Sequence, residues 1–191
     1  MRKDDFKDGS RRVFAAIVPP PAVRSELFSL SGRIAAALGN IKLRRVPAEN
    51  LHITLRFIGE ASDADVADLQ KNAKIAADLE TAFVLRVGEL GVFRNRGGCA
   101  VWVGIKDDAE NTTSAKLAEI AAKLGGGVMK QFVPHLTIGR TRSKIRRIPN
   151  NIQVTPMEFT VNELVIFESV LKPTGAEYSI ISRHPLRKRA T

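Results

Sequence analysis

Apolar positions between residues 12 and 40 change from a continuous run to a helical repeat. The segment RVFAAIVP at 12–19 is apolar enough for a short buried strand, and the three prolines at 19–21 end it. Behind the prolines, apolar residues recur at intervals of four, three, four and four: Val23, Leu27, Leu30, Ile34 and Leu38. This spacing predicts an amphipathic helix that ends at Gly39.

The rest of the chain alternates between strand-like and helix-like patterns. A capping box at Ser62 and Asp65 opens a second predicted helix, and a third helix, with Leu117 and Ile120 on its apolar side, ends at the glycines 125–127. Near-alternation of apolar and polar residues predicts strands at 41–46, 50–59, 83–93, 99–105, 132–140, 157–169 and 176–186. We expect a long hairpin turn at 94–98. Because several strand pairs are joined by short turns, we predict an α+β fold with antiparallel pairing.

Two of the three histidines lie in the same four-residue pattern. The segments HITL at 52–55 and HLTI at 135–138 both read histidine, aliphatic, threonine, aliphatic. Side chains alternate between faces in a strand, so His52 and Thr54 point the same way, about 7 Å apart, and His135 and Thr137 repeat this arrangement. The histidines are 83 residues apart, close to half the chain. This suggests an internal duplication in which two similar lobes each contribute one strand to a shared cleft.

The repeated pattern supplies the groups that phosphodiester hydrolysis needs. One group must take a proton from the attacking water and another must protonate the departing oxygen, and an imidazole with an ordinary pKa of about 6.5 can do either near neutral pH. The threonine hydroxyls can donate hydrogen bonds to phosphate oxygens. We expect no metal and no cofactor, since neither histidine has a carboxylate or cysteine at ligand spacing.

Composition narrows the class of protein. The 191 residues are 44% hydrophobic and 26% charged, which excludes a disordered or membrane-spanning chain. A single cysteine, Cys99, excludes an intramolecular disulfide and is typical of a reducing compartment. The first apolar run is too short for a signal peptide or a membrane helix. We therefore expect a cytoplasmic protein without membrane association.

The net charge of the chain indicates which class of molecule it binds. The net charge of +10 favours polyanions, with phosphate as the first chemistry to consider. From residue 123 onward there are 12 Lys and Arg against 4 Asp and Glu, so the excess is concentrated late in the chain. Its densest cluster, at 140–147, begins at the second tetrad, where it could follow a nucleic-acid backbone.

The two tetrads and their flanks also carry a resemblance to a known family. HITL and HLTI resemble the paired His-x-Thr-x motifs of the two-histidine phosphoesterase superfamily. Within it, VPAENLHITLRFIGE, VPHLTIGR and ELVIFESVLKPTGAEYSIISRHPL are similar to the bacterial and archaeal RNA 2′,3′-cyclic phosphodiesterases, historically called 2′-5′ RNA ligases. The resemblance runs from about Arg12 to Leu186.

This resemblance implies a fold, a reaction and a domain organisation. The implied fold is bilobal, with two antiparallel sheets facing each other across a central cleft and helices outside. The implied reaction opens a terminal 2′,3′-cyclic phosphate on RNA to a 2′-phosphate, with His52 as proton donor to the 3′ oxygen and His135 as proton acceptor from water. We expect a flexible leader at 1–11, one phosphoesterase domain at 12–186 and a basic tail at 187–191, in a monomer with no obligate protein partner.

Three further residues are candidates for substrate binding. Phe57 and Arg140 each stand five positions after a motif histidine, and the resemblance implies that the aromatic lies under the terminal base or ribose while the arginine binds the phosphate. Strict alternation places both on the face opposite the histidines unless the strands are bulged, and Gly139 could permit a bulge in the second copy. The parity of Arg56 instead directs it into the cleft.

Other functions compete with this hypothesis. A non-catalytic RNA-binding module would use the same basic surface and would treat the tetrads as ordinary strands. A phosphodiesterase acting on a small cyclic nucleotide or a 2′-5′ oligonucleotide would use the same chemistry on another substrate, and reverse 2′-5′ joining to a 5′-hydroxyl end is also conceivable. We expect His184 to be structural and Trp102 to serve in packing, at the rim of the cleft.

Overall fold

The computed structural model describes residues 11–108, 110, 112–126, 132–173 and 175–188. Residues 1–10 and 189–191 lie outside this part, so most of the predicted leader and much of the predicted basic tail are outside the described residues. The described part contains no helix long and apolar enough to cross a membrane.

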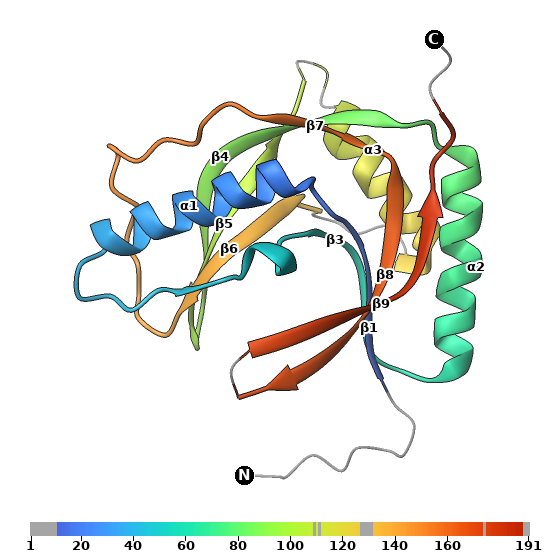
Figure 1. Ribbon diagram of the computed structural model, residues 1–191, viewed down its shortest axis with the longest axis horizontal. Helices are drawn as coiled ribbons and strands as arrows, with labels where there is room; N and C mark the ends of the chain where they lie inside the picture. Colours follow the sequence, from blue (N-terminus) through green and yellow to red (C-terminus); the bar gives the residue numbers. More distant parts are fainter. Residues whose placement is uncertain (1–10, 109, 111, 127–131, 174, 189–191) are drawn as a thin grey trace.

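In these described residues, the fold consists of antiparallel strands and three α-helices (Figure 1). The helices are α1 (Pro21–Ala37), α2 (Asp63–Leu79) and α3 (Thr112–Ala121), the last followed by a π-helical turn. The strands are β1 (Arg11–Ile17), β2 (Arg44–Arg45), β3 (Ile53–Ala61), β4 (Phe83–Asn95), β5 (Gly98–Lys106), β6 (His135–Thr141), β7 (Glu158–Val161), β8 (Glu163–Lys172) and β9 (Gly175–Pro185). The predicted α+β class is thereby confirmed.

The strands form two four-stranded halves that meet at a single residue pair. One half has the order β9-β8-β1-β3 and the other β6-β5-β4-β7, with the short β2 added beside β6. Ile53 of β3 and Leu136 of β6 are the one pair in register between the halves. The two expected sheets are thus continuous. Because Ile53 and Leu136 are the second residues of the two tetrads, this junction places the tetrads side by side.

Chain order and spatial order differ in a way that the sequence-level duplication did not predict. Strands β4 to β7 are consecutive in the chain and build the half that contains His135. The half that contains β3 combines early strands, β1 and β3, with the last two, β8 and β9. Apart from the short β2, the His135 half is therefore inserted within the other half, and the two halves do not follow one another along the chain.

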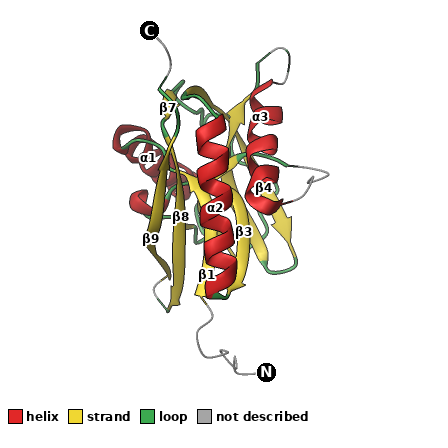
Figure 2. Cartoon of the chain, turned by 90° about the vertical axis from the view of Figure 1, so that its right-hand side faces the viewer, coloured by secondary structure: helices red, strands yellow, loops and turns green. Residues whose placement is uncertain are grey.

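The helices cover the apolar faces of the two halves. Prolines 20 and 21 begin α1, which buries Val23, Leu27, Leu30 and Ile34 and contacts β2 and β6. The Ser62–Asp65 capping box that opens α2 is present as predicted. This helix packs on the half formed by β9, β8, β1 and β3 (Figure 2). Residues 53, 55, 136 and 138 of the two tetrads face this common core, which leaves the histidines and threonines on the other side.

Three predicted elements differ in length. The predicted strand at 41–46 is reduced to Arg44–Arg45. The predicted strand at 157–169 is divided at Asn162 into β7, which pairs with β4, and β8, which pairs with β1. The predicted long hairpin turn is short, since β4 and β5 stay paired out to Asn95 and Gly98. Gly98 has a φ of 135°, and a Cβ there would lie 2.0 Å from the Thr141 carbonyl oxygen, so the close approach of β5 to β6 requires glycine.

Candidate active site

A cavity of about 440 Å³ lies where the two halves of the sheet meet. It contains both histidines and both threonines of the tetrads, together with Phe57 and Arg140. Its other lining residues are Arg12, Phe14, Arg44, Val46, Asn50, Ser169, Leu171, Lys172, Gly175, Ala176 and Tyr178. Among the lining residues that the structure describes, four side chains are cationic and none is Asp or Glu. The cavity is therefore suited to an anion.

Both histidine rings are held in the same orientation. Nδ1 of His52 lies 2.7 Å from the carbonyl oxygen of Asn50, and Nδ1 of His135 lies 2.7 Å from that of Val133. A carbonyl oxygen only accepts hydrogen bonds, so each Nδ1 must carry the proton that it donates. In the neutral ring this leaves Nε2 as the free base, and in the charged ring Nε2 carries the second proton. Each imidazole can thus exchange a proton through Nε2.

Aromatic side chains fix each imidazole from the side. Phe14 and Tyr178 pack on His52, with ring centroids 4.8 Å and 5.4 Å away. Phe93 and Trp102 pack on His135, at 4.8 Å and 5.9 Å, both in edge contacts. Nε2 of His52 also lies 3.1 Å from the Thr54 hydroxyl.

Burial and positive charge favour the neutral form of both rings. Loss of solvent lowers the pKa of His52, and the hydrogen bond to Asn50 only partly offsets this, while His135 and Arg140 lower it further. Burial likewise lowers the pKa of His135, against the opposing hydrogen bond to Val133, and Arg140 adds to the lowering. An anion in the cavity would oppose both effects. Protonation of the imidazoles would therefore be coupled to the binding of an anion in the cavity.

A β-bulge brings Phe57 to the cavity. Thr54 and Arg56 pair with adjacent residues of β1, so Leu55 is the extra residue of a bulge in β3. Phe57 returns to the side of Thr54, where it lines the cavity with 51% of its surface exposed. Arg56 pairs with the core residue Ala15 and is not among the lining residues. The expectation that strand parity directs Arg56 into the cleft is wrong, because the bulge reverses the alternation.

A second bulge at the same motif position brings Arg140 to the cavity. Thr137 and Gly139 pair with adjacent residues of β5, which makes Ile138 the extra residue. Gly139 accompanies this bulge, as the sequence suggested, but the bulge in β3 forms without a glycine. The two copies therefore match beyond the tetrads, in a backbone irregularity that places the residue five positions after each histidine in the site.

Several lining residues were not singled out from the sequence. Arg12 and Phe14 lie on the face of β1 opposite the core residues Val13 and Ala15, so alternation within the first strand could have identified them. Tyr178 comes from β9, whose position beside β8 and β1 cannot be read from local pattern.

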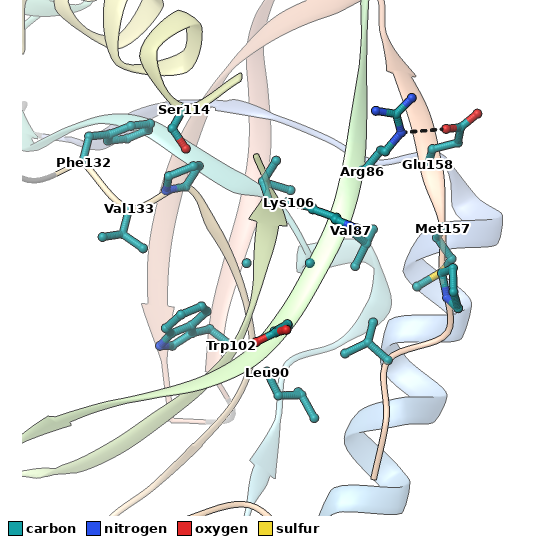
Figure 3. Close-up of a pocket in the computed structure, with 17 residues that line it drawn as sticks. Arg86, Val87, Leu90, Trp102, Lys106, Ser114, Phe132, Val133, Met157 and Glu158 are labelled. Atoms are coloured by element: carbon teal, nitrogen blue, oxygen red, sulfur yellow. Dashed lines mark hydrogen bonds and ion pairs between the residues drawn. The ribbon is translucent and has the colours of Figure 1, made fainter. Parts of the chain in front are cut away.

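Trp102 lines a second, larger cavity and contacts His135, which lines the first. The second cavity, of about 950 Å³, extends from Trp102 along β4 and β5 toward Phe132 and Met157 (Figure 3). The ion pair between Arg86 and Glu158 lies on its lining. Trp102 stacks on Phe93 with centroids 4.8 Å apart. The packing role expected for Trp102 is therefore combined with contact to His135.

The remaining histidine lies outside the site. His184 is absent from the lining of the cavity, and its Nε2 lies 2.9 Å from the Ser182 hydroxyl. Within the described ranges, no group of three or more His, Cys, Asp or Glu side chains could hold a metal ion.

The chain is similar to known phosphoesterases in sequence and in fold. The family model described as "LigT like Phosphoesterase" matches residues 17–101. An RNA 2′,3′-cyclic phosphodiesterase of Thermus thermophilus is 29% identical over 186 residues, which cover 92% of this chain and 90% of that protein. The crystal structure of TT0787, also of T. thermophilus, has a TM-score of 0.71 at 27% identity, with 94% of this chain and all of that chain covered. E. coli LigT complexed with ATP has a TM-score of 0.75 at 24% identity, with 94% and 99% covered, which supports the fold.

Proposed function

We propose that this chain, which is similar to LigT-like phosphoesterases over residues 17–101 and to RNA 2′,3′-cyclic phosphodiesterases over most of its length, hydrolyses terminal 2′,3′-cyclic phosphates on RNA. The observation that carries the proposal is the pair of imidazoles, each with Nδ1 on a backbone carbonyl, in one cavity whose described lining residues include no Asp or Glu. The relatives' names add the substrate class.

In the proposed reaction, water attacks the phosphorus of the cyclic phosphodiester while Nε2 of His135 takes its proton. The bond between phosphorus and the 3′ oxygen breaks, and the proton on Nε2 of His52 passes to that oxygen. The product is a 2′-phosphate beside a free 3′-hydroxyl. The assignment of donor and acceptor follows the order of the motifs in the family that the chain resembles.

The other cavity residues have roles that fit this chemistry. The hydroxyls of Thr54 and Thr137 would donate to the non-bridging oxygens, and the guanidinium of Arg140 would offset the charge that develops on them. Phe57, exposed at the rim, would support the terminal base or ribose. The negative charge of the bound phosphodiester would raise the lowered pKa of His52, so that the donor becomes protonated when substrate is present.

The direct test offers RNA with a 2′,3′-cyclic end in excess chelator and maps the product. We expect a 2′-phosphate end from the unmodified protein and a loss of roughly 10²-fold to 10⁴-fold in His52→Ala and in His135→Ala. His184→Ala is the matched control, since this third histidine is outside the cavity. A 3′-phosphate product, or near-full activity in either of the first two variants, would contradict the proposal.

A modified leaving group separates the two roles. A 3′-thio leaving group needs no protonation, so it should restore much of the rate of His52→Ala and little of the rate of His135→Ala. Restoration of His135→Ala alone would reverse the assignment.

The competing functions predict different outcomes in the same assay. A non-catalytic RNA-binding module would bind the RNA with strong salt dependence and leave the cyclic end intact. Addition of a 5′-hydroxyl oligonucleotide tests the reverse 2′-5′ joining.

A further inference from the structure

Two arginines that line the active-site cavity lie opposite each other on neighbouring strands. The pairing of β2 with β6 places Arg44 opposite Arg140 and Arg45 opposite Gly139. Like charges directly opposite on antiparallel strands destabilise the pairing. Within the described part of the chain, no carboxylate is within ion-pair distance of Arg44 or Arg140. An anion between them would offset this repulsion.

The next residue, Arg45, shows how this fold uses an arginine structurally. Its Nε donates to the Ser31 hydroxyl at 2.9 Å, its Nη2 donates to the Phe28 carbonyl oxygen at 2.7 Å, and its guanidinium lies 3.6 Å from the Phe28 ring centroid. Arg44 is exposed and makes no side-chain hydrogen bond to the described residues. The two neighbours differ in that only Arg44 keeps its donors available to a ligand.

Arg44 and Arg140 also join the cavity to a second depression. This depression has a volume of about 580 Å³ and, like the cavity, is lined by both arginines. Lys42 and Arg142 add two further cations, and Asn95 and Ser143 add neutral polar groups to a described lining without Asp or Glu. A path of positive charge therefore leads outward from the two histidines.

Resting on the proposed function, we propose that this depression binds the phosphodiester on the 5′ side of the terminal nucleotide. In a cyclic-ended RNA, that phosphodiester is attached to the 5′ oxygen of the ribose that carries the reacting phosphate. With the reacting phosphorus between the histidines, the neighbouring phosphate meets Arg44, whose planar fork suits phosphate oxygens. Arg44 is thereby a specificity-determining residue, and the protein selects an RNA strand over a cyclic mononucleotide.

Three substrates test the proposal: a cyclic-ended trinucleotide, the same trinucleotide with a neutral methylphosphonate at the adjacent linkage, and a 2′,3′-cyclic mononucleotide. Arg44→Gln should lower kcat/KM for the first about tenfold, as expected for a lost charge-assisted hydrogen bond. Its effect on kcat/KM for the other two should be several-fold smaller, because neither carries a charged phosphate at the adjacent linkage. The slope of log kcat/KM against log salt should become shallower by about 0.7 for the trinucleotide.

Arg183→Gln is the matched control, because it removes the same charge at a site away from the cavity. Arg183 lies on β9 and forms an ion pair with Glu163 of β8. This variant should leave all three substrates within about twofold. Equal losses on the three substrates in Arg44→Gln, or a tenfold loss in Arg183→Gln, would overturn the second phosphate site.

A binding measurement keeps this inference separate from the proposed function. Fluorescence anisotropy with a 2′-phosphate-ended trinucleotide needs no turnover, and Arg44→Gln should weaken its binding about tenfold. Weakened binding without hydrolysis of any cyclic end would refute the proposed function and leave the phosphate site standing. Hydrolysis of the trinucleotide with binding and kcat/KM insensitive to Arg44 would refute the phosphate site and leave the function standing.

Discussion

Replacement of Gly91 by alanine should disturb the candidate active site through Trp102. Gly91 lies opposite Trp102 in the pairing of β4 with β5. A Cβ at this position would lie 2.1 Å from Cζ2 of the indole and 2.4 Å from Cε2 and Cη2. Carbon atoms in contact prefer about 3.5–4.0 Å, so the ring would have to move by roughly 1.5 Å. It cannot do so freely, because Phe93 and His135 pack against it.

The expected cost of this overlap is about 1–3 kcal/mol of unfolding free energy. This cost outweighs the stabilisation of roughly 0.5–1 kcal/mol that replacement of glycine by alanine normally brings in a strand interior. Because the displaced indole would push on His135, we also expect kcat to fall by up to about 10²-fold. Urea denaturation measures the first effect and hydrolysis of a cyclic-ended RNA measures the second.

A double-mutant cycle gives the refuting result. In a Trp102→Leu background the indole is absent, so Gly91→Ala should become neutral or stabilising there. Gly104→Ala is a milder control, since its Cβ would lie 3.2 Å from Cζ3 of the same ring. If Gly91→Ala costs the same with and without the indole, the steric argument is wrong.

Three further outcomes are expected. In addition to burial, the positive charge of Arg140 lowers the pKa of both motif histidines, so Arg140→Gln should raise both pKa values. Both limbs of the pH profile of kcat/KM should then move to higher pH, whereas Arg140→Lys should leave them in place. An unchanged profile in Arg140→Gln would contradict this. Ser62→Ala should cost about 1 kcal/mol in urea denaturation, because the Asp65 amide loses its cap, with turnover unchanged. Ser31→Ala should cost about 1–3 kcal/mol by leaving Nε of Arg45 without its partner, and an unchanged denaturation midpoint would show that water replaces the hydroxyl.

The sequence identified the helices and the motif residues because both depend on local pattern. The apolar repeat from Val23 and the capping box at Ser62 act within a few turns of one helix, and both are present in the structure. The tetrads could be found because strand alternation holds over four residues.

The sequence could not place residues whose position depends on pairing between distant segments. The orientation of Arg56 follows from a bulge in β3, which is recognised from the pairing register of β3 with β1 and not from the local sequence. The position of Arg44 beside Arg140 depends on a pairing across 96 residues of sequence. The insertion of one half of the sheet within the other had no counterpart in the 83-residue spacing of the histidines.

The nested connectivity bears on how the protein is made. Strands β4 to β7 pair only with one another, with β2 and, at one residue, with β3, so most of this half can form from a continuous stretch of chain. The other half needs β1 to pair with β8, where Arg12 meets Ser169, and such a long loop closes late. Phe14 and Tyr178, which hold His52, come from these two ends of the chain. A nascent chain on the ribosome therefore lacks an ordered His52 until its last strands have emerged, so the candidate active site is completed only after nearly the whole chain has been synthesised.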